Sequence, residues 1–333
     1  MLAFAQAATS GPADVPATLP KVRVEAEAPG YKAETTSTAT KTDTPLRDVP
    51  QSITVVTRQL IDDQNMQNLA DVVRYVPGIG MAQGEGNRET PVFRGSSSTA
   101  DFFLDGMRDD VQYYRDLYNI DRVEVLKGPN GMIFGRGGVG GVINRVSKEA
   151  GWTPVRELSL QGGSDSNRRI AVDVGQAFDE NSAFRINGMY EDSDSYRDGV
   201  TLERYGVNPT LTLRAGEKTR IVVGAEYFKD ERVADRGVSS WQGRPVETDP
   251  STFFGDPEQS PVDATVKAVN ALVEHEFNDT FTLRNRTRYG DYDKFYQNVF
   301  PGAVTGGTTV ALSAYNNATQ RSEEHTSELQ SPI

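Results

Sequence analysis

The chain has 333 residues and a net charge of −12, and hydrophobic residues make up 37% of it. This length allows two domains, and the acidic balance argues against nucleic acid as a partner, which would require a basic surface. There is no cysteine, and the two histidines, His275 and His325, lie far apart, so disulfides are excluded and a transition-metal site is disfavoured. No apolar run reaches about 18 residues, the length that a membrane-crossing helix needs.

Residues 1–43 precede the first strongly patterned segment. Residues 1–10 contain the small-x-small form of a secretory cleavage site, Ala5-Gln6-Ala7, which predicts the remnant of a signal peptide; a disordered terminus is the alternative. Residues 11–43 are rich in Pro, Ala, Thr and Glu, and this composition predicts disorder. Within them Lys21–Ala26 alternates like a short strand. Such a strand can add to the sheet edge of another protein, or it can be an unpaired linker.

Residues 44–150 predict a compact α+β domain. Strands are expected at 52–57, 92–95, 101–104, 123–126 and 142–146, and helices at 58–64 and 69–76. Five glycines between Gly135 and Gly141 indicate backbones that pack too closely for side chains, or turns with positive φ. The same run matches the dinucleotide-binding pattern G-x-G-x-x-G. That pattern must open a helix, whereas the residues that follow here are β-branched and predict a strand.

From residue 151 onward, apolar and polar residues alternate in segments of about 10 residues, long enough to cross a bilayer as tilted strands. Ile170, Val172 and Val174 are one such series, and the residues between them are polar or small. One apolar and one charged face, with connections that are alternately short and long, indicate a transmembrane β-barrel. A soluble β-sandwich is the alternative.

The pattern gives roughly seven strands before Gln320, whereas a plugged barrel transporter has about 22. Residues 151–320 are therefore expected to be the N-terminal part of a barrel. The last segment, Arg321–Ile333 (RSEEHTSELQSPI), stops alternating and resembles the translation of a sequencing adapter. We expect residues 321–333 to be non-native.

The segment VEVLKGPNGMIFGRGGVGGVINRVSK, residues 123–148, resembles the end of the plug domain of TonB-dependent outer-membrane receptors. Thr44–Gln64 resembles the start of that domain in siderophore receptors, and Phe93-Arg94-Gly95 and Phe103–Gly106 match its internal strands. Phe134 stands where the family usually has Tyr. The resemblance implies an α+β plug at 44–150, followed by the first strands of an antiparallel barrel in the outer membrane of a Gram-negative bacterium.

The function that the resemblance implies is uptake of a ferric siderophore, of catecholate or hydroxamate type. Vitamin B12, haem or an oligosaccharide are alternative substrates, and a soluble β-rich binding domain is a less favoured reading. No catalytic motif is present, and no enzyme activity is expected. The iron would be held by the siderophore, so no resident cofactor or metal is expected. The resemblance also implies two partners besides the substrate, namely outer-membrane lipid and the periplasmic energy transducer TonB.

The resemblance assigns two groups of site residues. The TonB box would comprise Val22, Arg23, Val24, Glu25 and Ala26. The apical loops of the plug would contact the substrate through Gln83, Asn87, Arg88, Ser97, Arg108, Tyr113, Tyr114 and Arg115. Arginine suits an anionic chelate and tyrosine offers an aromatic face, although ordinary loop residues or plug–barrel contacts are the alternative. The inward-facing Arg284, Arg286 and Arg288 are expected to pair with plug carboxylates.

Overall fold

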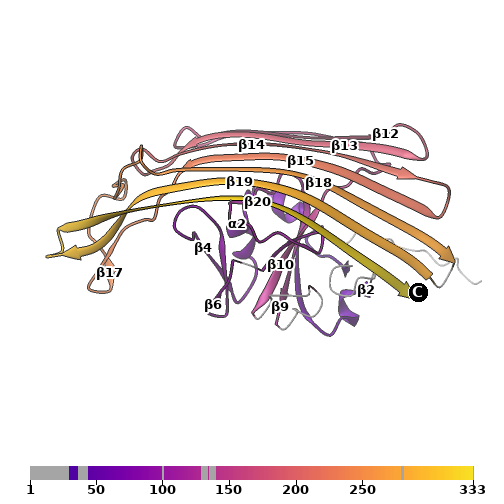
Figure 1. Ribbon diagram of the computed structural model, residues 1–333, viewed down its shortest axis with the longest axis horizontal. Coiled ribbons are helices and arrows are strands. Elements are labelled where there is room, and N and C mark those ends of the chain that lie inside the picture. The colour runs from indigo at the N-terminus through magenta and orange to yellow at the C-terminus, as the bar shows by residue number, and fades with distance from the viewer. Residues whose placement is uncertain are drawn as a thin grey trace, which may run out of the picture.

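The computed structural model describes residues 30–36, 44–99, 101–128, 134, 140–278 and 281–332. A small plug domain lies against the concave face of a large curved sheet (Figure 1). In that view the hairpin strand β17 (Arg244–Pro245) lies to the left of the plug and strand β2 (Thr44–Pro45) lies to its right, below the wall. No helix in the described ranges is long and apolar enough to cross a membrane. The expected signal remnant at 1–10 and the TonB box at 22–26 lie outside the described residues.

The plug is built on a mixed five-stranded sheet flanked by short helices. Its strand order is β3 (Ser52–Thr57), β9 (Ile120–Lys127), β10 (Gly141–Ser147), β7 (Phe102–Leu104) and β8 (Met107–Arg108). A second sheet consists of β4 (Ile79–Ala82), β5 (Thr90–Phe93) and β6 (Ser96–Ser97). The helices are η1 (Leu46–Asp48), α1 (Arg58–Asp63) and α2 (Leu69–Val73). The expected α+β domain is confirmed.

Local sequence explains where both α-helices begin. The side-chain oxygen of Thr57 accepts a hydrogen bond from the backbone N–H of Leu60, and Asn68 accepts one from Asp71. Thr and Asn are favoured at this position because their oxygens satisfy N–H groups that the first turn leaves unpaired. The second helix is shorter than expected, since residues 74–76 form turns.

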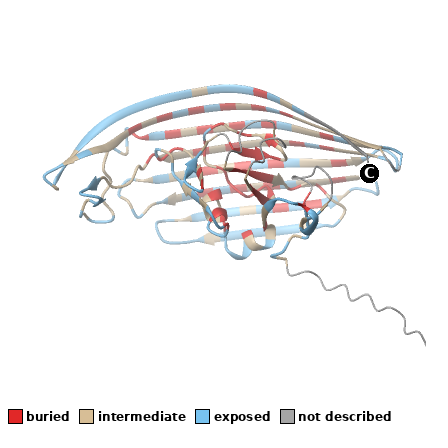
Figure 2. Cartoon of the chain, turned by 90° about the horizontal axis from the view of Figure 1, so that it is seen from below, coloured by how far each residue is buried: buried red, intermediate tan, exposed pale blue. Residues whose placement is uncertain are grey.

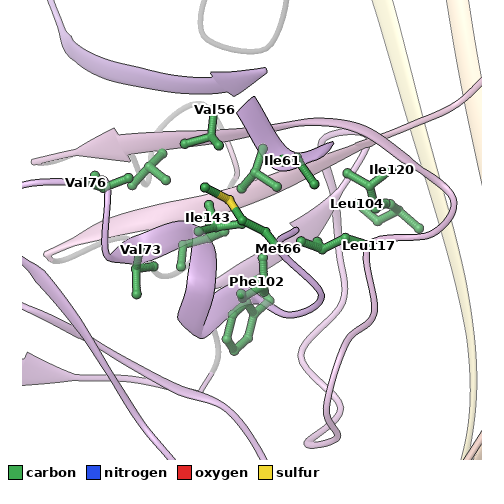
Figure 3. Packing of buried hydrophobic residues seen from close by; sticks show 14 of the residues in the cluster. Val56, Ile61, Met66, Val73, Val76, Phe102, Leu104, Leu117, Ile120 and Ile143 are labelled. Atoms are coloured by element: carbon green, nitrogen blue, oxygen red, sulfur yellow. The ribbon is translucent and has the colours of Figure 1, made fainter. Parts of the chain in front are cut away.

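The hydrophobic core of the plug lies between its helices and the mixed sheet (Figure 3). It gathers Ile61, Val73, Phe102, Ile143 and neighbouring side chains, which are almost completely buried. Burial of each large aliphatic or aromatic side chain contributes about 1.5–3 kcal/mol to folding. The plug therefore has an apolar core of its own, separate from the barrel wall.

Gly141 shows why glycine is needed beside these strands. A Cβ atom at this position would lie 2.5 Å from the carbonyl oxygen of Leu126 and 2.6 Å from Cε1 of Phe93. The expected close approach of backbones is thus found at Gly141, while residues 135–139 lie outside the described part. Gly141 opens strand β10, so the helix required by a dinucleotide-binding motif does not follow the glycine run.

The barrel wall is an eight-stranded antiparallel sheet in which each strand pairs with the next in sequence. Its strands are β11 (Val155–Gly162), β12 (Arg168–Ala177), β13 (Ser182–Asp194), β14 (Thr201–Arg214), β15 (Thr219–Val233), β18 (Pro261–Asn278), β19 (Phe281–Thr305) and β20 (Thr309–Pro332). A small hairpin of β16 (Ser240–Trp241) and β17 interrupts the connection between β15 and β18.

The wall has one strand more than the alternation indicated. This strand, β20, includes residues 321–332, which pair with β19 throughout. Its residues alternate weakly in sequence, so their pairing is set by β19 rather than by their own hydrophobic pattern.

The two faces of the wall differ as expected for a barrel. Buried and exposed residues alternate along its strands (Figure 2). Leu158 and Leu160 are 64% and 71% exposed on the outer face, whereas Ala183 and Asn187 are fully buried on the face toward the plug. In the described part of the chain no second sheet covers the outer apolar face, which contradicts the sandwich alternative.

Connections at one end of the wall are short, such as 215–218, and at the other end they include the long loop 234–260. In outer-membrane barrels the short turns face the periplasm and the long loops face outward. We call the two ends of the wall the turn side and the loop side accordingly.

Residues 30–36 contact the plug, although the composition of residues 11–43 predicts disorder. Strand β1 (Thr35–Thr36) pairs with β2. The hydroxyl of Tyr31 donates a 2.5 Å hydrogen bond to Asp63, and the hydroxyl of Thr57 donates one of 2.5 Å to the carbonyl oxygen of Gly30. The chain that follows the expected TonB box is thus attached to helix α1.

Candidate functional site

Buried ion pairs join the plug to the barrel wall. Asp116 of the plug accepts hydrogen bonds from Arg169 on β12 at 2.8 Å and lies 3.1 Å from a guanidinium nitrogen of Arg204 on β14. Lys148, just after the plug sheet, lies 2.7 Å from Asp173 on β12. Paired charges of this kind are costly to break, because the remaining partner would be buried without compensation. The plug is therefore held in one position against the wall.

A second cluster surrounds Asp109, which is completely buried. Its carboxylate accepts a 3.0 Å hydrogen bond from Nε of Arg115 and another from Arg145, together with hydrogen bonds of 3.1 Å from the hydroxyls of Tyr113 and Tyr292. Burial alone would raise the pKa of Asp109, but Arg115 and Arg145 outweigh it and hold this pKa well below its ordinary value. Asp109 is thus an ionised centre that binds two plug arginines and one barrel tyrosine.

In two neighbouring plug residues, Tyr113 and Glu89, burial outweighs the nearby positive charges and raises the pKa. Burial raises the pKa of Tyr113 to about 12, so its hydroxyl stays a hydrogen-bond donor to Asp109. Burial also raises the pKa of Glu89 above its ordinary value, although Arg115 acts against this shift. The carboxylate oxygens of Glu89 accept hydrogen bonds from the backbone N–H groups of Leu69 and Arg115.

A cavity of about 670 Å³ opens at the loop side of the wall, between the plug loops 84–90 and 109–113 and strands β19 and β20. We call it the outer cavity. Its cations include Arg88 of the plug, Arg236 of the long loop and Lys294 of β19, and its aromatic side chains are Tyr296, Phe300 and Tyr315. The remaining lining residues are Glu85, Asn87, Asp110, Val111, Gln112, Ala314, Asn317, Thr319 and Arg321.

The long loop is attached to the plug beside this cavity. Arg236 lies 3.0 Å from Glu85 in an ion pair, and its guanidinium group stacks 3.8 Å above the ring of Phe300. A Cβ atom at Gly86 would lie 2.5 Å from the carbonyl oxygen of Asp235. The long loop therefore lies directly against the plug backbone at Gly86. A movement of the plug at this point would require the long loop to move as well.

The predicted substrate residues fall into three groups. Asn87 and Arg88 line the outer cavity. Gln83 and Ser97 are exposed, Arg108 pairs with Asp110 at 3.2 Å, and the hydroxyl of Tyr114 donates a 3.1 Å hydrogen bond to the carbonyl oxygen of Gln83. These four do not line that cavity.

Tyr113 and Arg115 require a correction. Both are buried in the Asp109 cluster and present no surface to a ligand. Arg115 donates further hydrogen bonds to backbone carbonyls of its own loop, at Asp109, Val111 and Tyr113. Both residues therefore hold the plug together, and the ring of Tyr113 also packs against the wall residues Phe228 and Tyr292.

The expectation for the three barrel arginines is met in part. Arg286 lies 3.2 Å from the plug carboxylate of Asp105, as expected. Arg284 instead pairs with Glu274 on the adjacent barrel strand, and the nearest carboxylate to Arg288 is that of Glu226 on β15, at 3.9 Å. For these two residues the carboxylates of these ion pairs belong to the wall, although Arg288 also interacts electrostatically with the plug carboxylate Asp109.

Lys294, Tyr296 and Phe300 were not expected at the site. The only feature of the sequence that could have indicated them is alternation. Like Tyr292, they stand at even-numbered positions of β19, and alternate residues of a strand share one face, here the inward one. Arg236 lies in a long loop, where sequence gives no indication of which cation approaches the plug.

Comparisons with known proteins agree with this architecture. Residues 45–142 match the TonB-dependent receptor plug domain. Over 299 residues the chain is 30% identical to a probable TonB-dependent siderophore receptor, PiuA, of Acinetobacter baumannii, and the match covers 86% of the chain and 40% of the relative. It is 32% identical over 307 residues to the catecholate siderophore receptor Fiu of Escherichia coli K12, with the same coverage of 86% and 40%. The chain thus spans about 40% of the length of these relatives.

Solved structures give the same result. The crystal structure of PiuA from Acinetobacter baumannii superposes with a TM-score of 0.82 at 27% identity, covering 90% of this chain and 45% of that one. The open form of the ferric-catecholate import receptor Fiu from E. coli K12 superposes with a TM-score of 0.79 at 27% identity, covering 90% and 49%. The chain thus carries the plug domain of the TonB-dependent receptors, followed by eight strands of the outer-membrane barrel found in that family.

Proposed function

We propose that the receptor containing this chain imports an anionic ferric siderophore across the outer membrane. The observation that carries the proposal is the outer cavity, which combines cations with aromatic rings at the loop side of the plug. Ferric catecholates carry negative charge and aromatic rings, so they match both features. The names of two relatives, a catecholate siderophore receptor and a probable siderophore receptor, support the same substrate class.

Different residues of the cavity would contact the charged oxygens and the aromatic rings of the chelate. Arg88 and Arg236 would make charge-assisted hydrogen bonds to the oxygens of the chelate. Tyr296 and Tyr315 would offer aromatic faces to its rings. Gln83, Ser97, Arg108 and Tyr114 remain candidate contacts for a chelate that extends beyond the cavity. Because the siderophore would supply all ligands to the iron, the protein would recognise the chelate and not the metal.

The energy for transport is proposed to come from a partner protein, because no nucleotide-binding motif is found that could supply it. Residues Val22–Ala26 would pair as a strand with the periplasmic transducer TonB. The segment that follows contacts helix α1 through the Tyr31–Asp63 hydrogen bond. A pull on the N-terminal segment would therefore reach the plug through this contact.

Binding is tested with the purified full-length receptor and four ligands: a ferric catecholate, a ferric hydroxamate, haem and vitamin B12. Quenching of intrinsic fluorescence should show saturable binding of the ferric catecholate. Arg236→Gln should weaken it about tenfold, the loss of roughly one charge-assisted hydrogen bond. Arg156→Gln is the matched control, since Arg156 is exposed on β11. Saturable binding of haem or vitamin B12 alone would contradict the proposal.

Energy coupling is tested by deleting residues 21–26 from the full-length gene. Cells should still bind the ferric chelate but should lose uptake of radioactive iron under iron limitation. Normal uptake by the deletion strain would reject the role of this segment, without affecting the proposed ligand.

A further inference from the structure

The inward face of β19 connects two cavities on opposite sides of the plug. The outer cavity is lined by Lys294 and Tyr296 of this strand. A second cavity of about 550 Å³, which we call the turn-side cavity, is lined by Arg284 and Arg286 of the same strand. Alternate residues of a strand share a face, and 12 residues at about 3.3 Å each span about 40 Å. One strand therefore presents side chains to both cavities.

The residues of this face are cationic or phenolic over most of that length. We call them the β19 row: Arg284, Arg286, Arg288, Tyr292, Lys294 and Tyr296. All of these side chains have groups that can donate hydrogen bonds, and four of them are cationic residue types. A surface of this kind attracts anions.

Oxygen atoms of the plug form ion pairs and hydrogen bonds with several side chains of the β19 row. Asp105 lies 3.2 Å from Arg286, and Asp109 accepts a 3.1 Å hydrogen bond from Tyr292. Glu149, which follows the plug sheet, lies 3.4 Å from Arg286. At the outer end, the backbone oxygens of Asn87 and Gln112 accept hydrogen bonds from Lys294. The plug thus offers carboxylates and carbonyls where an anion would otherwise bind.

Arg288, in the middle of the row, differs from its neighbours. Its side chain is only 1% exposed, and none of its three guanidinium nitrogens has a hydrogen-bond partner among the described residues. Its closest ion-pair distance there is 3.9 Å, to Glu226. A buried guanidinium group without hydrogen bonds is costly. Its donors are therefore available to an anion that reaches this point of the wall.

We propose that the β19 row is the path along which the anionic ligand passes the plug, from the outer cavity to the turn-side cavity. Arg288 provides a binding position for the anion between the two cavities. At rest the plug carboxylates Asp105 and Asp109 neutralise the row, and when the plug rearranges the ligand takes their place. This inference rests on the proposed function, because it requires that an anionic ligand is imported.

The test separates binding from transport in the full-length receptor. Cells that express Arg288→Gln should bind a ferric tris-catecholate as wild type does, since Arg288 lies outside the outer cavity. Their initial uptake rate should fall about tenfold, which corresponds to about 1.4 kcal/mol of barrier. Arg288→Lys, which keeps the charge, should restore most of the uptake. Arg156→Gln is the control, because Arg156 is exposed on β11, away from β19, and it should keep near-normal uptake.

Three results would overturn the path. They are unchanged uptake by Arg288→Gln, equal loss in the Gln and Lys variants, and equal loss in Arg156→Gln. If Arg288→Gln does not reach the outer membrane, Arg284→Gln decides, since this residue is partly exposed at the turn-side cavity, and unchanged uptake would again reject the path. Failure of wild-type cells to bind any ferric chelate would refute the proposed function itself, and the path with it.

Discussion

The Nζ atom of Lys294, on barrel strand β19, lies 2.5 Å from the side-chain oxygen of Asn87, in a plug loop 207 residues away in sequence. The same ammonium group donates hydrogen bonds to the carbonyl oxygens of Asn87, at 3.1 Å, and of Gln112, at 2.5 Å. An ammonium group has three donors, and here all three are directed at the plug. One lysine therefore attaches two plug loops, 84–90 and 109–113, to the wall.

Lys294→Met should release these loops. Loss of the hydrogen bonds to a charged donor leaves plug oxygens without a partner, at a cost on the order of 3 kcal/mol. Hydrogen exchange in the full-length receptor should become faster at residues 84–90 and 110–114 and stay unchanged in β3. Lys267→Met is the control, because Lys267 is exposed on β18. Equal exchange rates in wild type and Lys294→Met would show that this lysine does not hold the loops.

Asp109→Asn should destabilise the receptor much more than a substitution on its surface. The change leaves the guanidinium groups of Arg115 and Arg145 buried without their counter-charge, and removal of one partner from a buried pair costs about 3–5 kcal/mol. Thermal unfolding in detergent, followed by circular dichroism, measures the effect. Asp192→Asn, at an exposed position of β13, should leave the unfolding temperature nearly unchanged. Similar unfolding temperatures for the two variants would contradict the assigned role of Asp109.

The pH dependence of Asp109 has a defined sign. Its pKa in the folded protein is depressed, so its ionised form contributes stability that is fully present above the unfolded pKa of about 4. That contribution is lost as the pH falls below this value. The difference in unfolding free energy between wild type and Asp109→Asn should therefore narrow from pH 5 toward pH 2. A constant difference over this range would show that the Asp109 pKa is not depressed.

Glu89 should give the opposite trend. Its pKa in the folded protein is raised by burial, so the protonated form contributes stability below the unfolded pKa of about 4.3. This contribution is lost as the pH rises through the folded value. Relative to Glu89→Gln, which cannot ionise, the wild type should lose stability as the pH is raised above about 4. Unfolding free energies of the two proteins at several pH values measure the slope, and parallel curves would contradict the prediction.

Local features of the plug could be predicted from its sequence because they depend on neighbouring residues. The strand at Ser52–Thr57 was expected with the bounds that the structure shows, and Thr57 marks the start of helix α1 through its cap. The inward and outward faces of the barrel strands also follow from alternation alone. In these cases the physical cause lies within about ten residues of chain.

Contacts between distant segments could not be predicted in the same way. Arg115 has the sequence environment of a polar loop residue, and its burial depends on Glu89, 26 residues away in sequence, and on Arg145, which shares the carboxylate of Asp109. Likewise nothing in the sequence around Lys294 indicates that its partner is Asn87 of the plug. Strand β20 was missed because its pairing with β19 does not depend on a regular hydrophobic pattern of its own.

Gly141 offers a direct test of close backbone packing in the plug. Gly141→Ala would place a Cβ atom 2.5 Å from the carbonyl oxygen of Leu126 and 2.6 Å from the ring of Phe93, and such overpacking costs about 1–3 kcal/mol. Gly80→Ala is the matched control, since Gly80 also lies in a plug strand and a Cβ there would meet nothing within 4 Å. The midpoint of urea unfolding should fall for Gly141→Ala and stay unchanged for Gly80→Ala. If both variants unfold at the wild-type midpoint, β9 and β10 must be able to separate at Gly141 without cost, and the glycine would have no packing role there.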